Sequence, residues 1–206
     1  MEDVLSLYEQ PYDPVNPKVT FDERPCQLIG DVLAPLPMEA GKPQREDYHY
    51  ERNGVCNVFI AFQPHTGQRL VAVYQRRTHK EYADFFKELS QHYPDASKIT
   101  VIQDNLNTHT PASFYKVFPP AEAFALAKRF EMHYTPKNAS WLNMAEIELA
   151  ALSKQCFDRR IPDMVTLERE AKAWTFERNR KGSTVNWQFT KDKAREKFSR
   201  FYPNLS

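Results

Sequence analysis

Three carboxylates lie at positions where an acid is costly unless it has a partner. Asp22 ends the predicted strand KVTFDE, Asp104 follows the apolar run Lys98–Gln103, and Glu146 lies on a strongly predicted helix. Buried carboxylates need a counter-charge, and three gathered together repel one another unless divalent cations join them. Oxygen ligands with open coordination positions suit Mg²⁺ or Mn²⁺. Two such ions can activate a water or a 3′-hydroxyl and stabilise the leaving oxygen in phosphoryl transfer.

Each of these acids also has an ordinary structural role. Asp104 can form a turn with Asn105, Asp22 can end a strand, and Glu146 can be a solvated helix residue. Composition and spacing alone favour these ordinary roles. A metal site is therefore a hypothesis that the residue types permit and do not by themselves establish.

The third acid is ambiguous from helix geometry. The core-facing stripe of the helix within SWLNMAEIELAALSKQCF consists of Ala145, Leu149, Leu152 and Cys156. At about 100° per residue, Glu146 and Glu148 flank this stripe on opposite sides, so only one of them easily faces the aspartates. Periodicity does not choose between the two.

Hydrophobic periodicity and turn signals predict the elements that position these acids. After KVTFDE, two strand-like runs around a Gly-bearing turn form a hairpin, Gly54–Phe62 and Arg69–Gln75. A helix with Thr78 as its N-cap precedes the strand Lys98–Gln103. The stretch PASFYKVFPPAEAFALAKRF then predicts two short helices broken at its Pro-Pro pair, and EMHYTP predicts another strand.

The rest of the chain is predicted to be mainly helical. The strong helix, capped by Asn138 or Ser140, precedes a helix from Met164 to about Arg180, a break at Gly182 and a basic helix within Lys191–Tyr202. Residues 1–17 are predicted to be irregular and APLPMEAGKPQRED to be a loop, because seven of the 15 prolines fall at or before Pro43. This order predicts an α/β domain whose mixed central sheet is antiparallel in its first three strands and parallel afterwards, with flanking helices.

Composition and charge narrow the class of protein. With 41% hydrophobic and 27% charged residues in 206, the chain has a globular composition. From Arg159 onward there are 12 Lys and Arg against 6 Asp and Glu, whereas residues 1–158 hold 16 against 21. A basic tail on an acidic body favours a polyanionic partner, although solvated helix faces explain it equally well. Three widely spaced cysteines and an N-terminus without a secretion signal predict a cytoplasmic protein with no membrane role.

Other chemistries find little support in the sequence. Cys156 lies on the predicted core stripe and the other two cysteines have no evident partner, so nucleophilic cysteine catalysis is disfavoured. Five glycines and no glycine-rich phosphate loop argue against nucleotide binding. The candidate contacts to nucleic-acid phosphates, equally explicable as solvated charges, are Arg76, Arg77, Arg159 and Arg160.

Three ordered blocks carry a resemblance to a known family. FDERP, VIQDNLNTHT and YTPKNASWLNMAEIELAAL together resemble the bacterial insertion-sequence transposases related to the mariner group, which have a DDE catalytic domain of the RNase H-like fold. The resemblance runs from about Glu2 to Tyr202. Any one block alone would be weak, whereas three in the expected strand and helix contexts are specific.

The resemblance assigns roles to individual residues. It implies that Asp22, Asp104 and Glu146 are the catalytic acids and the ligands of two Mg²⁺ or Mn²⁺ ions, with Glu146 chosen over Glu148 by the pattern Leu-Asn-x-x-Glu. It implies that Asn105, His109 and Asn143 line the site, although His109 is also readily explained as a core residue or turn donor. The 41 residues between the second and third acids (105–145) exceed the spacing of eukaryotic mariner relatives, which fits the bacterial branch.

The resemblance also implies an organisation and an activity. Residues 1–160 are expected to form the catalytic core and 161–206 a basic helical extension, without the N-terminal helix-turn-helix domain that binds transposon ends. The expected activity is cleavage at those ends and strand transfer into target DNA, by a nucleoid-associated homodimer that receives its recognition domain from another polypeptide. The alternatives are a catalytically incompetent remnant or regulatory subunit that binds DNA or a partner, and a domesticated nuclease that does not join ends.

Overall fold

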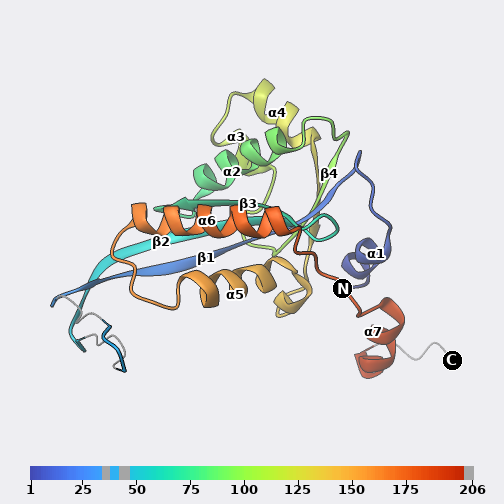
Figure 1. The fold of residues 1–206 in the computed structure, drawn as a ribbon. Helices are drawn as coiled ribbons and strands as arrows, with labels where there is room; N and C mark the ends of the chain where they lie inside the picture. The colour runs from blue at the N-terminus through green and yellow to red at the C-terminus, as the bar shows by residue number, and fades with distance from the viewer. Residues whose placement is uncertain (34–37, 42–46, 202–206) are drawn as a thin grey trace.

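The computed structural model describes residues 1–33, 38–41 and 47–201, and most of the predicted loop 34–47 lies outside these ranges. A five-stranded sheet in the order β3-β2-β1-β4-β5 forms the centre of the fold (Figure 1). Its strands are β1 (Lys18–Asp31), β2 (Tyr50–Gln63), β3 (Gln68–Tyr74), β4 (Ile99–Gln103) and β5 (Phe130–Tyr134). β1 pairs antiparallel with β2, as does β2 with β3, whereas β4 is parallel to both of its neighbours. The predicted mixed sheet is therefore confirmed.

Helices cover both faces of this sheet (Figure 1). On one side lie α2 (His79–His92), α3 (Ala112–Tyr115) and α4 (Pro120–Lys128). On the other lie α5 (Ala145–Cys156) and α6 (Met164–Lys181). The short helices α1 (Glu2–Glu9), α7 (Lys191–Lys197), η1 (Ser140–Leu142) and η2 (Ser199–Phe201) complete the fold. In the described ranges, every helix is too short or too polar to cross a lipid bilayer.

Strand alternation separates two apolar cores across the sheet. Val19 and Phe21 of β1 point to one face, where they pack in a cluster rich in aromatic residues under α2. Val58 and Ile60 of β2 point to the other face, where they pack against α5 and α6. Because α6 contributes Leu167, Ala171 and Trp174 to that second core, residues beyond 160 help to bury the sheet.

Two predictions about the chain termini and helix caps were wrong. The N-terminal residues form α1, because Val4, Leu5 and Leu7 lie on one helical face and are buried in a cluster with Ile102 and Leu142. Neither Asn138 nor Ser140 caps α5, whose N-cap residue, Met144, has no side-chain bond. Instead, the Asn143 Oδ1 atom accepts a hydrogen bond from the Ala145 backbone N–H, 3.1 Å away.

Other helix boundaries follow their local signals, as predicted. Thr78 and Glu81 form a capping box at the start of α2. Pro120 begins α4, where its fixed φ and missing N–H do no harm. Asp163 caps α6 through the Thr166 N–H, and Gly182 ends that helix with a left-handed φ of 59°.

Replacing Thr78 with alanine should lower the free energy of unfolding by about 1 kcal/mol, because the first-turn N–H groups of α2 would lose their acceptor. Chemical denaturation of the variant and the wild-type protein measures this loss. Ser140→Ala is the matched control, since Ser140 caps no helix in this structure and its loss should change stability by less than about 0.5 kcal/mol. Equal losses in the two variants would contradict the role given to Thr78.

Candidate active site

Asp22 and Asp104 lie side by side because of the register between two parallel strands. Thr20 of β1 pairs with Ile102 of β4. Asp22 lies two residues beyond this pair on β1, and Asp104 directly follows Gln103, the last residue of β4. Adjacent strands are about 4.8 Å apart, which places both acids at one end of the parallel part of the sheet. Asp22 was predicted to end its strand, and this detail was wrong. β1 continues to Asp31 because its outer half pairs with β2 alone.

Asn143 links the first aspartate to the helix that carries the third acid. Its Nδ2 atom donates to the Phe21 carbonyl oxygen at 2.8 Å and lies 3.3 Å from Asp22 Oδ2. Its Oδ1 atom receives the Ala145 N–H, so one buried side chain fixes the start of α5 against β1. Glu146 follows in the first turn of that helix and is exposed to solvent.

The surroundings of Asp22 raise the pKa of its carboxyl group. Burial raises the pKa of the Asp22 carboxyl to about 7, with further increases from the charges of Glu146, Glu23 and Asp104. The Glu23 backbone N–H opposes this by donating to Asp22 Oδ1 at 2.8 Å. The three acids predicted from the sequence therefore lie near the same end of the parallel strands.

His109 connects the second aspartate to a further acid. Its Nδ1 atom forms an ion pair with Asp104, and its Nε2 atom lies 3.0 Å from the Glu23 Oε2 atom. Burial alone would lower the pKa of His109, but the two carboxylates outweigh it and raise the pKa to about 9. The imidazole in turn holds the pKa of Asp104 below its usual value. The imidazole ring also stacks on the Tyr82 ring, with the two ring centroids 5.1 Å apart. His109 is therefore both a core residue and a neighbour of the acids.

Glu23 is a member of this site that the sequence interpretation missed. Its side chain is only 4% exposed and also lies 3.8 Å from the Arg77 guanidinium. The sequence hint for Glu23 is its place next to Asp22 in FDERP. Strand alternation, however, directs the Glu23 side chain to the opposite face of the sheet from Asp22. The contact between Glu23 and His109, which follows β4 in the chain, shows that a side chain on that face belongs to the site.

The donor set fits a hard divalent cation. Asp22 has a raised pKa, to which burial and then neighbouring negative charges contribute, and such carboxylate oxygens are ligands that Mg²⁺ or Mn²⁺ binds. Across residues 1–33, 38–41 and 47–201, no three acid, imidazole or thiol groups already converge as a complete metal cage. Asp104 forms an ion pair with His109, and Glu146 is exposed to solvent.

In metal-free protein, Asp22→Asn should increase stability at pH 8 and have little effect near pH 4. The folded-state pKa of Asp22, about 7, exceeds the value of 3.8 for an unperturbed aspartate. The folded state therefore binds the extra proton, and stability falls as the pH rises between these two values. Each unit of the difference corresponds to about 1.4 kcal/mol, and partial solvent exposure reduces the total.

The measurement is urea denaturation in excess chelator from pH 4 to pH 8. The control is Asp95→Asn, because Asp95 is an exposed aspartate before the opposite end of β4. A pH-independent difference between Asp22→Asn and the wild-type protein would contradict the raised pKa.

The four predicted phosphate contacts have different surroundings. Arg77 lies beside the acids, where its charge helps to lower the pKa of Asp104. Arg76 is exposed next to it. Arg159 forms an ion pair with Glu170, and Arg160 forms one with Asp31. Arg77 therefore lies near the acids with Glu23 as its carboxylate partner, whereas Arg159 and Arg160 are paired with other carboxylates.

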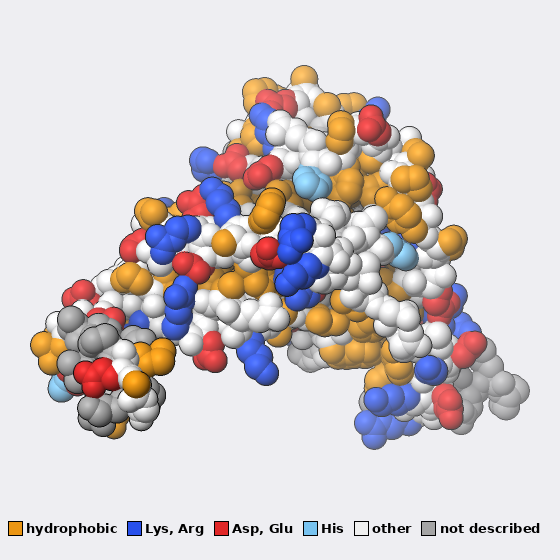
Figure 2. Space-filling view, in the orientation of Figure 1, with side chains coloured by type: hydrophobic (Ala, Val, Ile, Leu, Met, Phe, Trp, Pro, Cys, Tyr) orange, Lys and Arg blue, Asp and Glu red, His pale blue; other side chains and the backbone are white. Residues whose placement is uncertain are grey.

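The basic C-terminal residues are interspersed with acids. Figure 2 shows Lys and Arg side chains along the α6 face with Asp and Glu among them. Lys172 pairs with Glu168, and Arg180 and Lys181 pair with Glu177. These pairs support the solvated-face interpretation of this charge run, while the net positive charge of the segment remains.

A hollow of about 510 Å³ opens beside Asp104. Asn105, Lys137 and Ser140 are among the residues that line it. Asn105 is exposed and has no role in the core, which fits its predicted place at the edge of the site. The second acid is therefore accessible from this hollow.

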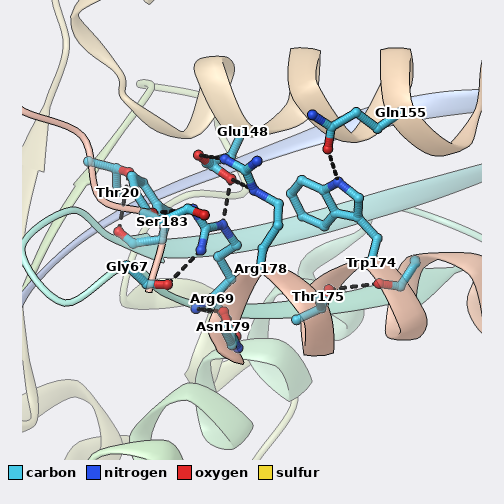
Figure 3. A network of polar contacts seen from close by, with 12 residues as sticks. Thr20, Gly67, Arg69, Glu148, Gln155, Trp174, Thr175, Arg178, Asn179 and Ser183 are labelled. Carbon is cyan, nitrogen blue, oxygen red and sulfur yellow. Dashed lines mark hydrogen bonds and ion pairs between the residues drawn. The ribbon is translucent and has the colours of Figure 1, made fainter. Parts of the chain in front are cut away.

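Glu148 lies in a different environment from Glu146. Its side chain is 1% exposed and forms ion pairs with Arg69 and Arg178, on the side of α5 that faces α6 (Figure 3). The two glutamates thus flank the core stripe on opposite sides, as the periodicity predicted. Of the two, only Glu146 raises the pKa of Asp22 through its charge.

Comparisons with known proteins agree with this fold. Residues 17–168 match the family described as DDE superfamily endonuclease, and the chain belongs to that family. No curated protein matches the chain by sequence.

Several solved structures share the fold. The Mos1 mariner paired end complex with Mn is 14% identical, with a TM-score of 0.58 over 88% of this chain and 55% of that one. The Mos1 strand transfer complex is 14% identical, with a TM-score of 0.57 over 88% of this chain and 54% of that one. The fold is therefore the RNase H-like fold of Mos1 transposase. This chain spans about half the length of these structures.

Proposed function

We propose that this chain is the catalytic domain of a DDE transposase of the bacterial insertion-sequence branch. It cuts DNA strands at the ends of a mobile element and joins the freed 3′ ends to target DNA. The observation that carries this proposal is the gathering of Asp22, Asp104 and Glu146 around one end of the parallel strands, in a chain of the DDE endonuclease family. The intact set of acids favours an enzyme over an incompetent remnant.

Asp22, Asp104 and Glu146 would hold two divalent cations, Mg²⁺ or Mn²⁺. When bound, these ions supply Lewis acidity to the attacking and leaving oxygens of the phosphodiester. Among the solved structures with this fold are Mos1 paired end complexes with Mn and with Mg, which supports the choice of metals. Asn143 orients Asp22, and His109 orients Asp104 through the ion pair described above.

DNA is the proposed partner, bound by its phosphates across the hollow beside Asp104. Arg76, Arg77 and Lys137 supply positive charge around the acids, and their contribution to affinity falls as salt rises. A homodimer on DNA is proposed by analogy with the paired end complexes of Mos1. Recognition of the element's ends is proposed to come from a helix-turn-helix domain, which a separate polypeptide can supply.

A strand-cleavage assay tests the proposal. The chain is incubated with DNA that carries the element's ends and Mg²⁺ or Mn²⁺, alone and with a supplied recognition domain. The expected result is nicking that disappears in chelator, followed by joining of the 3′ ends to a target plasmid. Absence of metal-dependent nicking in both arms would overturn the proposal, and nicking without joining would reduce it to a nuclease.

A further inference from the structure

A buried ion cluster of Arg69, Glu148 and Arg178 joins α5 to the rest of the fold (Figure 3). Arg69 comes from β3 and is fully buried, and its Nε atom donates to Glu148 Oε2 at 2.5 Å. Arg178 comes from α6 and donates to both Glu148 oxygens, at 2.9 and 3.1 Å. The cluster therefore ties β3 and α6 to one carboxylate of α5.

The guanidinium groups of this cluster are themselves held in place. Arg69 donates to the carbonyl oxygens of Gly67 and Ser183, at 2.5 and 2.6 Å. Asn179 exchanges two 2.9 Å hydrogen bonds with the Arg69 backbone, so α6 covers the open edge of β3. A Cβ atom at Gly67 would lie 2.7 Å from the Gly182 backbone, which shows how closely the turn packs against the end of α6.

Stability is a poor explanation for this arrangement. Removing three charged groups from water costs several kcal/mol per ion, and apolar residues of similar volume are often as stabilising or more so. The neighbouring core of Leu149, Leu167 and Trp174 shows that this location can accommodate apolar side chains. Ion pairs differ from apolar contacts in that their charge-assisted hydrogen bonds are directional. They therefore fix the orientation of the helix that carries them, which non-directional apolar packing does not.

The orientation that the cluster fixes is that of Glu146. Glu146 and Glu148 are separated by about 200° around the helix, so the direction of one determines the direction of the other. At its start, α5 is held to β1 by Asn143. Glu148 supplies a second attachment on the opposite side, and Glu146 lies between the two attachments.

We propose that Arg69, Glu148 and Arg178 are positioning residues, which hold the rotation of α5 so that Glu146 faces Asp22 as a metal ligand. This inference rests on the proposed function and assigns a role that the three acids alone do not explain. Loss of the cluster leaves all three proposed ligands in the chain but lets α5 rotate, so metal affinity falls while the fold persists.

The test compares metal binding with stability in the same variants. In the triple variant Arg69→Met, Glu148→Leu and Arg178→Leu, the cluster is replaced by apolar side chains. We expect it to retain the wild-type melting temperature in chelator and to bind Mn²⁺ about 10-fold more weakly by calorimetric titration. Arg178→Gln gives the same readout with a smaller change, since Arg178 is 22% exposed and its loss is compatible with folding.

Arg129→Met is the matched control. Arg129 donates to carbonyl oxygens of Ser90, Tyr93 and Ala96 on the other side of the sheet, away from α5. This variant should melt at a lower temperature and bind Mn²⁺ with wild-type affinity. In nicking assays, the cluster variants should need about 10-fold more Mn²⁺ for half-maximal rate, and Arg178→Lys should restore part of the difference.

The outcomes separate the two proposals. If wild-type protein binds Mn²⁺ in a manner that depends on Asp104, but the cluster variants bind it equally well, the positioning role is wrong and the proposed function stands. If they bind it more weakly only in proportion to a loss of folded protein, as measured by circular dichroism, the role is likewise overturned. If wild-type protein binds no Mn²⁺, the proposed function fails and the positioning role fails with it.

Discussion

Asp104→Asn should abolish metal-dependent strand cleavage while leaving the fold and DNA binding intact. The amide keeps the shape of the side chain but removes the negative charge that a divalent cation requires. Asp104 directly follows β4, and its side chain is 47% exposed. The substitution removes one of the two carboxylate partners of the buried His109. His109 keeps its ion pair with Glu23 and therefore holds the loop in place.

The measurement is the nicking rate with Mg²⁺, together with DNA affinity at a fixed salt concentration. Asp95→Asn, the same chemical change near the other end of β4, should retain the wild-type rate. Glu146→Gln should lose activity as Asp104→Asn does. Full activity in Asp104→Asn would remove this residue from the proposed metal site.

The second large effect is expected on stability. Glu148→Ala should lower the free energy of unfolding by about 3–5 kcal/mol, because Arg69 would remain fully buried without its counter-charge. Urea denaturation of purified protein measures the change.

Glu146→Ala is the control, since Glu146 is exposed and forms no ion pair with these arginines in the described ranges. Its stability should change by less than about 0.5 kcal/mol. Loss of Glu146 should therefore remove activity at wild-type stability, whereas loss of Glu148 should lower stability. Similar stability losses in both variants would contradict the environments assigned to them.

Local signals in the sequence were sufficient for much of the fold. Thr78 with Glu81, the Pro119-Pro120 pair and Gly182 each act within a few residues, so they marked helix boundaries correctly. Two strand-like runs around a Gly-bearing turn identified the hairpin of β2 and β3. The α1 helix was missed because its short apolar face is stabilised by docking against Ile102 and Leu142, which no local pattern reveals.

The three acids of the candidate site were singled out from the sequence by their places in or after strands and on a strong helix, and the family resemblance gave them their expected role. The supporting residues of the site were not singled out, because their partners are distant in sequence. Arg69 looks like an ordinary polar residue at a strand end, and only α6, 110 residues later at Asn179, covers it. Glu23 points away from Asp22 and joins the site only through His109. Sequence motifs identify the proposed metal ligands, whereas tertiary contacts are needed to identify the residues that position them.

The wide sequence separation within the ion cluster also bears on how the protein matures. Arg178 follows Glu148 by 30 residues, so the chain reaches Cys156, the end of α5, well before the second arginine is made. During synthesis, α5 can therefore pack on β1 and β2 through its apolar stripe, with Arg69 but not Arg178 available to pair with Glu148. If the cluster acts as proposed, a nascent chain at this stage carries all three acids without an aligned cutting centre. Completion of α6 would then add the last attachment that aligns the proposed metal ligands.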